Sequence, residues 1–213
     1  MRFERLQWIV GNEPVFETGL LLAGDVDPAS VRRQLSRLVA SGRLLQLRRG
    51  LYALAPPYQK SKPHPFLAAN HIMRPSYVSL QSALAHYGLI PEHVPVVTSV
   101  TTSRPGRWST PLGEFDYRHV KTGLFFGYRL EEVGGGQRAL IAVPEKALLD
   151  LVYLQPGSDQ PAYLRELRLQ NLDSLDLGFL EELAEISGSP KLRRAVKRIR
   201  EMALEETGEY ETL

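Results

Sequence analysis

The stretch from Ser30 to Leu54, SVRRQLSRLVASGRLLQLRRGLYAL, restricts the possible folds more than any other part of the chain. From Val31 onward, apolar residues recur at spacings of four, three and one, which places them on one face of an α-helix. Asp27 is a good N-cap, and Pro28 suits the first helical position because its missing N–H would have no partner there. The sequence therefore predicts a helix that begins at Pro28 and that Gly42 ends.

A short hairpin is predicted directly after this helix. The residues RLLQLRRGLYAL, from Arg43 to Leu54, read as two strands. A tight turn at Arg48-Arg49-Gly50 joins them, because the glycine can supply a positive φ.

Two further helices are expected before the basic one. The first covers Arg2–Val10, and the second starts near Pro14, with Phe16, Leu20 and Leu21 on one side. Two helices, a basic helix and a hairpin follow each other in this order in a winged helix-turn-helix domain. We place this domain at residues 1–57.

Charge is segregated along the chain. The formal net charge is only +2, yet no Asp or Glu occurs between Pro28 and Pro91. A basic region without neighbouring acids indicates a polyanionic partner such as DNA, and a merely solvated surface is the alternative. The major groove admits one helix, and arginine can form paired hydrogen bonds with guanine or phosphate. We assign base contacts to Arg33, Ser36 and Arg37, and phosphate contacts to Arg32, Arg43, Arg48 and Arg49.

The second half of the chain predicts a mixed α/β domain at residues 66–213, after a linker over Ala55–Pro65 that is rich in Pro and Lys. The fold class is therefore α/β of the α+β kind, with terminal helices. Strands are expected at residues 94–102, 113–120, 124–130 and 138–143. Helices are expected from a Ser79 cap to Gly88, from Pro144 to Leu154, near Gly178–Ile186 and over Pro190–Glu206.

The acids of this second domain could serve an enzyme. A metal-dependent nuclease would draw on Glu114, Asp116, Glu145, Lys146 and Asp150. Glu145 and Lys146 are adjacent on a helix and diverge by about 100°, whereas Lys146 and Asp150 are spaced for an i,i+4 pair. Surface and capping roles explain these residues better. The histidines lack a zinc-ligand pattern, and no phosphate-binding loop occurs, so we expect no catalytic residue, metal or cofactor.

Two other basic segments have open roles. Thr102–Trp108, TSRPGRW, reads as a loop in which Arg104, Arg107 and Trp108 suit a second nucleic-acid or partner contact. A half-buried tryptophan at the base of a hairpin is the alternative. The last helix carries basic residues that either face water or meet acidic protein or DNA; they are Lys191, Arg194, Lys197, Arg198 and Arg200.

The expected cellular location rests on three features that the sequence does not contain. It has no cysteine, no charged-then-apolar leader and no apolar run near the roughly 18 residues that span a bilayer. We therefore expect a cytoplasmic protein without membrane contact.

Four motifs, in their order along the chain, resemble the AbiEi-type antitoxins of bacterial type IV toxin-antitoxin systems. They are RRQLSRLVASGRLLQLRRGLYAL, PSYVSLQSALAHYGLIPE, VTSVTTSRPGRWSTPLGEFDYRHV and IAVPEKALLDLVYL, and the similarity runs from about Val15 to Leu154. The resemblance implies an N-terminal winged helix-turn-helix that binds inverted repeats in the promoter of its own operon and represses it. It also implies a C-terminal domain that counteracts a nucleotidyltransferase toxin without a stable complex. The DNA-contacting role then falls on Arg32, Arg33, Arg37, Arg48 and Arg49.

The sequence as a whole predicts a non-enzymatic, DNA-binding transcriptional repressor that acts as an antitoxin. A nucleic-acid-processing enzyme with a winged-helix targeting domain is the alternative, and a protein-interaction module is a third reading. No heptad seam or long edge strand indicates a preformed dimer, so we expect a monomer in solution.

Overall fold

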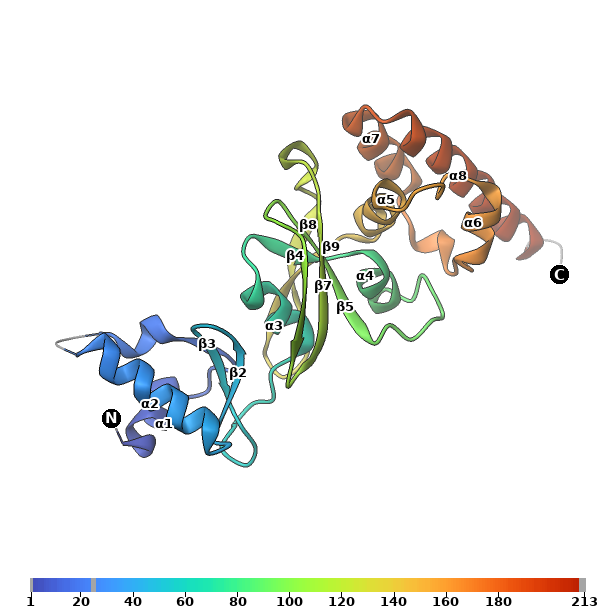
Figure 1. Cartoon of the computed structure of the whole chain (residues 1–213). Helices are drawn as coiled ribbons and strands as arrows, with labels where there is room; N and C mark the ends of the chain where they lie inside the picture. Colours follow the sequence, from blue (N-terminus) through green and yellow to red (C-terminus); the bar gives the residue numbers. More distant parts are fainter. Residues whose placement is uncertain (1, 24–25, 211–213) are drawn as a thin grey trace.

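The computed structural model describes residues 2–23 and 26–210, with side chains up to residue 205. It is a mixed α/β structure, as the sequence predicts, in which three regions follow each other in a row (Figure 1). An N-terminal lobe is followed by a central sheet with flanking helices and then by a group of C-terminal helices.

The N-terminal lobe has the element order of a winged helix. Its three-stranded antiparallel sheet has the order β1-β3-β2. The elements are α1 (Phe3–Val10), β1 (Phe16–Glu17), the 3-10 turn η1 (Thr18–Leu21), α2 (Pro28–Ala40), β2 (Leu44–Arg48) and β3 (Leu51–Leu54).

The α2 helix forms for the reasons that its sequence gives. The Asp27 carboxylate accepts hydrogen bonds from the backbone N–H groups of Ala29 and Ser30, each at 3.0 Å, so it satisfies two donors that lack helical partners. Pro28 occupies the first turn. After the helix, Gly42 has φ +68°, a left-handed conformation that suits glycine.

The expected helix after Pro14 is wrong. Phe16 instead lies in β1, where it pairs with Tyr52 of β3, and their ring centroids are 5.8 Å apart. Only Thr18–Leu21 is helical, as a 3-10 turn. The Thr18 N–H donates to the Gly50 carbonyl at 2.9 Å, so a pairing across 32 residues overrides the local pattern.

The central region is a six-stranded mixed sheet of order β6-β7-β5-β4-β9-β8. The pairs β5–β7 and β4–β9 are parallel, and the others are antiparallel. Helix α3 (Pro65–Ile72) lies on one face, and α4 (Leu80–His86) and α5 (Pro144–Leu154) lie on the other (Figure 1). The strands are β4 (Ser76–Val78), β5 (Val96–Thr101), β6 (Gly106–Thr110), β7 (Gly113–His119), β8 (Tyr128–Glu132) and β9 (Arg138–Ala142).

Several of these elements differ from the expectation. Helix α3 and strands β4 and β6 have no predicted counterpart. Pro65 does not break α3 but opens it, and the His64 side chain caps the helix by accepting a hydrogen bond from the Phe66 N–H at 3.1 Å. The strand expected at residues 124–130 begins only at Tyr128, after a 3-10 turn at Thr122–Leu124.

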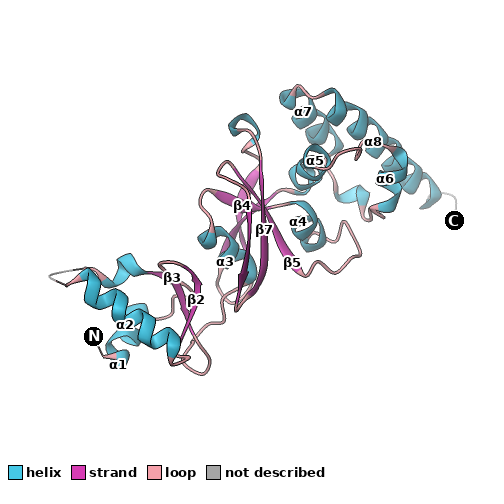
Figure 2. Ribbon diagram, viewed as in Figure 1, coloured by secondary structure: helices cyan, strands magenta, loops and turns pink. Residues whose placement is uncertain are grey.

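The C-terminal region packs helices on the far side of α5. Helix α7 (Leu177–Ser187) and helix α8 (Pro190–Tyr210) match the expected helices, whereas α6 (Pro161–Glu166) was not expected. Figure 2 shows that this end of the chain is entirely helices and loops. The predicted apolar stripe of α8 is buried at Leu192, Ala195, Val196 and Ile199.

The wing sheet has apolar contacts on both of its sides. Phe16 and Tyr52 belong to the core of the N-terminal lobe, whereas Leu47, Leu51 and Ala53 belong to the core of the central region. The hairpin therefore packs against the central region, and does not extend into solvent on both faces.

The buried side chain of Gln137 holds the last part of the segment between the N-terminal lobe and α3. The buried Gln137 accepts a hydrogen bond from the His64 N–H at 2.8 Å. Its amide group donates to the Ser61 hydroxyl at 3.0 Å and to the Lys62 carbonyl at 2.8 Å. Both N–H donors and one of the two oxygen lone pairs of this amide thus serve to fix the segment against the turn before β9.

Candidate nucleic-acid interface

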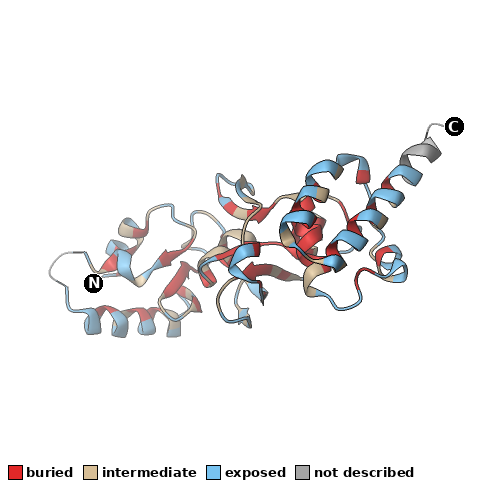
Figure 3. Cartoon of the chain, turned by 90° about the horizontal axis from the view of Figure 1, so that it is seen from above, coloured by how far each residue is buried: buried red, intermediate tan, exposed pale blue. Residues whose placement is uncertain are grey.

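The outer face of α2 presents the residues that the sequence singles out for base contacts. Val31, Leu35 and Leu38 point into the N-terminal core and are buried. In Figure 3 the N-terminal lobe accordingly shows exposed residues on its outside. The exposed residues of α2 include Arg32, Arg33, Ser36 and Arg37.

The cations on this face have few internal partners. Arg33 lies 3.7 Å from the Asp27 carboxylate, but 69% of its side chain remains exposed. Within the described residues, no acid forms an ion pair with Arg32 or Arg37. The Ser36 hydroxyl donates to the Arg32 carbonyl at 3.0 Å, so this hydroxyl is used within the helix. The face therefore offers three guanidinium groups to an external anion.

The hairpin arginines are placed less uniformly. Arg43 lies over the Phe3 ring, with its guanidinium carbon 5.2 Å from the ring centroid. Arg49, at the turn, is exposed, and it has no ion-pair partner in the part of the chain that the structure describes. Arg48 is half-buried, and its Nε donates to the His71 carbonyl at 3.3 Å. Arg48 is thus fixed to α3, whereas Arg49 is available to a ligand.

A cluster of charged groups joins the wing to the central region at this point. The Oε1 atom of Glu17 lies 3.6 Å from Arg48 Nη2 and 3.7 Å from Arg74 Nη1. His71 lies beside them, with its Nδ1 2.7 Å from Arg74 Nη2. Burial, and then the nearby charge of Arg74, lower the pKa of His71, so this ring is neutral and can accept the hydrogen bond.

Glu17 is not among the residues that the sequence predicts for the interface. The charge pattern nevertheless gave one indication of a basic site at Arg74, because this residue belongs to the acid-free run from Pro28 to Pro91. Glu17 is an acid that precedes that run. The two meet only because β1 pairs with β3, which sequence spacing does not show.

The residues of the second basic segment lie on a strand and its approach, and not in a loop throughout. Arg107 and Trp108 belong to β6, which pairs with β7, and Arg104 is exposed just before it. Arg107 Nε lies 3.4 Å from the Asp116 carboxylate. Trp108 is half-buried, with its ring edge against Tyr117 at a centroid distance of 5.1 Å. The structure thus gives Arg107 and Trp108 intramolecular partners.

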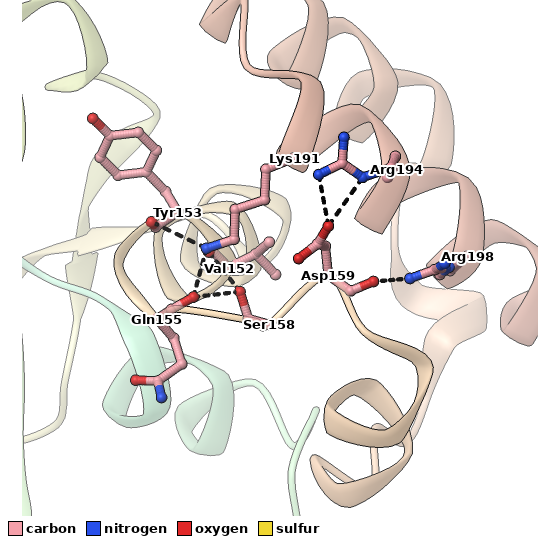
Figure 4. Close-up of polar contacts among 8 residues, drawn as sticks. All are labelled: Val152, Tyr153, Gln155, Ser158, Asp159, Lys191, Arg194 and Arg198. Atoms are coloured by element: carbon pink, nitrogen blue, oxygen red, sulfur yellow. Dashed lines mark hydrogen bonds and ion pairs between the residues drawn. The ribbon is translucent and has the colours of Figure 1, made fainter.

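The basic residues of α8 are mostly engaged inside the molecule. Figure 4 shows Lys191 beside the end of α5, where its ammonium group donates to the Gln155 carbonyl at 2.5 Å. Arg194 donates from two nitrogens to one oxygen of Asp159, at 2.8 and 3.0 Å, and Arg198 donates to the Asp159 carbonyl. The hydrogen bonds from Arg194 hold the pKa of Asp159 below its usual value. Arg200 pairs with Glu181.

The helix α5 contains a buried charged pair. Lys146 and Asp150 form the i,i+4 ion pair that their spacing predicts, but they are 0% and 1% exposed at their side chains. Asp150 also accepts hydrogen bonds from the Tyr77 hydroxyl at 3.0 Å and the Ser79 hydroxyl at 2.8 Å. Burial raises the pKa of Asp150 and lowers that of Lys146. The expectation of surface or capping roles is therefore wrong for both residues, because the packing of α5 against the sheet encloses them.

The same packing changes the role of Ser79. It occupies the N-cap position of α4, as expected, but its hydroxyl turns inward to Asp150 instead of capping the helix. Leu80 follows with φ +58°, an uncommon conformation for a residue with a side chain. Although this places serine, lysine and carboxylate together, Ser79 and Lys146 have no exposed surface, so no substrate can reach them.

The remaining acids do not converge. Glu145 is buried and accepts a hydrogen bond from the Asp176 N–H at 2.9 Å, and Glu114 is exposed on β7. No three His, Asp or Glu side chains of the described residues lie close enough together to hold a metal ion. In the same described ranges, no helix has both the length and the apolarity that crossing a membrane requires.

The exposed basic helix α2, followed by the wing-like hairpin, gives the N-terminal lobe the arrangement of a winged helix, with the 3-10 turn η1 in place of a second α-helix before α2. Residues 19–55 match the model of a protein family described as transcriptional regulator, AbiEi antitoxin. The match covers most of η1, all of α2 and the hairpin, so over these residues the chain is similar to that family, and the resemblance seen in the sequence is confirmed there. A comparison with curated proteins found no match for this chain.

Proposed function

We propose that the protein is a sequence-specific DNA-binding repressor of its own operon and the antitoxin of a type IV toxin-antitoxin system. Residues 1–57 are the DNA-binding domain of this proposal, and residues 66–213 form the antitoxin-like domain. The exposed, acid-free outer face of α2 is the observation that carries it.

The physical argument concerns the partners of the arginines. An exposed arginine that has no acid beside it, as Arg37, or only one at 3.7 Å, as Arg33, keeps most of its hydrogen-bond donors for a ligand. Arg33 and Arg37 would read base edges from the middle of such a face, beside Ser36. Phosphate contacts, which position the protein without reading sequence, would come from Arg32, Arg43, Arg48 and Arg49.

The antitoxin part of the proposal rests on the family match. The partner would be a nucleotidyltransferase toxin that this chain counteracts without a stable complex, and the protein itself would not be an enzyme. In this proposal the repressor acts in the cytoplasm, is a monomer in solution and binds inverted repeats in its own promoter.

Fluorescence anisotropy tests the DNA-binding part. The full chain is titrated onto DNA from immediately upstream of its own gene and onto scrambled DNA, over a series of salt concentrations. We expect specific binding with a log-log salt slope of about −4 to −6, since each neutralised phosphate contributes about 0.9.

A pair of matched variants makes this test specific. Arg33→Ala with Arg37→Ala should weaken binding to the upstream DNA by at least roughly 30-fold, because two base contacts of about 1–3 kcal/mol each are lost. Arg165→Ala with Lys197→Ala removes the same charge from exposed positions of the C-terminal helices and should leave binding nearly unchanged. Equal binding by the two variants, or no preference for the upstream DNA, would contradict the proposal.

Growth rescue tests the antitoxin part. Co-expression with a nucleotidyltransferase encoded in the same operon should restore growth, and the Arg33→Ala, Arg37→Ala variant should still rescue, because its change is confined to the DNA-binding domain.

A nuclease assay tests the alternative function. Labelled DNA and RNA should stay intact when incubated with the protein and Mg²⁺ or Mn²⁺. Cleavage would favour the nuclease alternative.

A further inference from the structure

We infer that the DNA-binding surface continues from the wing onto the loop after α3, and that Arg74 binds a DNA phosphate at a place that Glu17 occupies in the free protein. This inference rests on the proposed function, because it extends the same interface. The partner of this extended surface is the phosphate backbone of double-stranded DNA.

Two guanidinium groups meet at a single carboxylate oxygen. Arg48 Nη2 and Arg74 Nη1 lie 3.6 and 3.7 Å from Glu17 Oε1. Both groups have further contacts to His71, since Arg48 Nε donates to its carbonyl at 3.3 Å and Arg74 Nη2 lies 2.7 Å from its ring nitrogen. Two guanidiniums fixed in this way form a site for an oxyanion, because each can donate hydrogen bonds to it.

The carboxylate in this site is exchangeable. The side chains of Arg48, Glu17 and Arg74 are 34%, 46% and 56% exposed, so water reaches all three. Ion pairs with this exposure contribute little to stability, and a phosphate can therefore replace the carboxylate at small cost. In the free protein, Glu17 screens the two cations, and any DNA that approaches must displace it.

The site lies beside the turn of the wing. The Thr18 N–H donates to the Gly50 carbonyl at 2.9 Å, so the end of β1 is held against the turn that carries Arg49. The Arg48 guanidinium also donates to the Arg49 carbonyl at 3.1 Å. In the inferred complex, a DNA backbone that contacts the exposed Arg49 would bring a neighbouring phosphate to Arg74. The two regions of the chain would then share one DNA surface.

Removing the charge of Glu17 is the first test. Glu17→Gln in the full chain should tighten binding to the upstream DNA about three- to tenfold at low salt, with a smaller gain at high salt because salt screens the carboxylate. Glu13→Gln, an equal charge change at an exposed acid of the same lobe that has no ion pair among the described residues, should give less than half of that gain.

Removing the charge of Arg74 is the second test. Arg74→Gln should weaken binding roughly three- to tenfold and make the log-log salt slope shallower by about 0.9, the value for one phosphate. Arg165→Gln should change neither quantity. In the Arg74→Gln background, Glu17→Gln should gain less than it does in the wild-type chain, because one of the two cations that it releases is gone. Should Arg74→Gln fail to fold, the comparison of Glu17→Gln with Glu13→Gln decides alone.

The outcomes separate this inference from the proposed function. Specific binding by the wild type, with Glu17→Gln indistinguishable from Glu13→Gln, would overturn the inference and leave the repressor proposal standing. Equal binding of upstream and scrambled DNA by the wild type would overturn the repressor proposal itself.

Discussion

Helices α2 and α8 are both rich in basic residues, but they use them differently. On α2, Arg32 and Arg37 have no ion-pair partner among the described residues, and Arg33 has a distant one. On α8, Arg193, Arg194 and Arg200 are paired with Glu185, Asp159 and Glu181. Lys191 and Arg198 donate to backbone carbonyls (Figure 4).

The difference between the two helices comes from the acids around them. The sequence has none between Pro28 and Pro91, so α2 has no acid within its own run to pair with. Acids of the C-terminal region, by contrast, lie within reach of α8. A binding surface is therefore indicated by arginines that lack partners within the protein, and not by the number of arginines alone.

The largest loss of stability is expected at the buried ion pair of Lys146 and Asp150. Asp150→Ala would leave Lys146 buried without its partner, and we expect a loss of about 3–5 kcal/mol in the free energy of unfolding. Urea denaturation at pH 7 measures it. Asp173→Ala, at an exposed acid, should change the same quantity by less than about 0.5 kcal/mol. A similar small change for Asp150→Ala would show that the buried pair is not needed for folding.

The ion pairs of α8 should give the next largest effect on the free energy of unfolding. Asp159→Ala removes the acceptor of two hydrogen bonds from Arg194, and we expect a loss of about 2 kcal/mol at pH 7. Lys197→Ala, an exposed cation on the same helix, should have almost no effect.

The Asp159 effect should also depend on pH. Arg194 lowers the pKa of Asp159 in the folded chain, so its contribution is complete above the usual carboxyl pKa of 3.8 and is lost as the pH falls through the lower folded value. The difference in unfolding free energy between wild type and Asp159→Ala should therefore stay constant from pH 7 to 5 and narrow below about pH 4. A gap that widens towards acid would contradict the assigned ion pair.

A smaller effect is expected at the start of α2. Asp27→Ala removes the cap that accepts from Ala29 and Ser30, and it should lower the free energy of unfolding by about 1 kcal/mol. Thermal unfolding followed by circular dichroism measures the change. Asp27→Asn keeps one of the two accepting oxygens and, because asparagine is also a favourable N-cap, should retain most of the stability. Equal losses for both variants would mean that the charge, and not the cap, stabilises α2.

The smallest change in stability should come from the outer face of α2 itself. Arg32→Ala with Arg37→Ala removes two exposed cations without ion-pair partners among the described residues, so the free energy of unfolding should change by less than about 0.5 kcal/mol. The same variant should bind upstream DNA more weakly in the anisotropy assay. A large loss of stability would show that these arginines serve the fold, and the contrast with α8 would fail.

Local sequence signals were sufficient to predict those elements whose ends are marked by residues within or next to them. Helix α2 was predictable because Asp27, Pro28 and the apolar spacing from Val31 all act within a few residues. The hairpin followed from Gly50, and α5 from Pro144 and a continuous apolar run. In each case the determining contacts are short in sequence.

Long-range contacts determine the elements that were missed. Phe16 entered a strand because its partner is Tyr52, and Trp108 lies on a strand because β7 follows it and pairs back. The pairing of Lys146 with Asp150 was predictable from spacing, but its burial depends on Tyr77 and Ser79 from another part of the chain. The candidate interface was correspondingly easier to predict on α2 than at Glu17 and Arg74.

The Gln137 amide, which holds Ser61, Lys62 and His64, has a consequence for operator architecture. Because the connecting segment is fixed, each DNA-bound copy of the proposed repressor would carry its central and helical regions as an overhang in one direction along the duplex. Two copies on facing repeats would then tolerate only spacings at which these overhangs clear each other. Inserting half a helical turn between the repeats would disturb them far more than inserting a full turn.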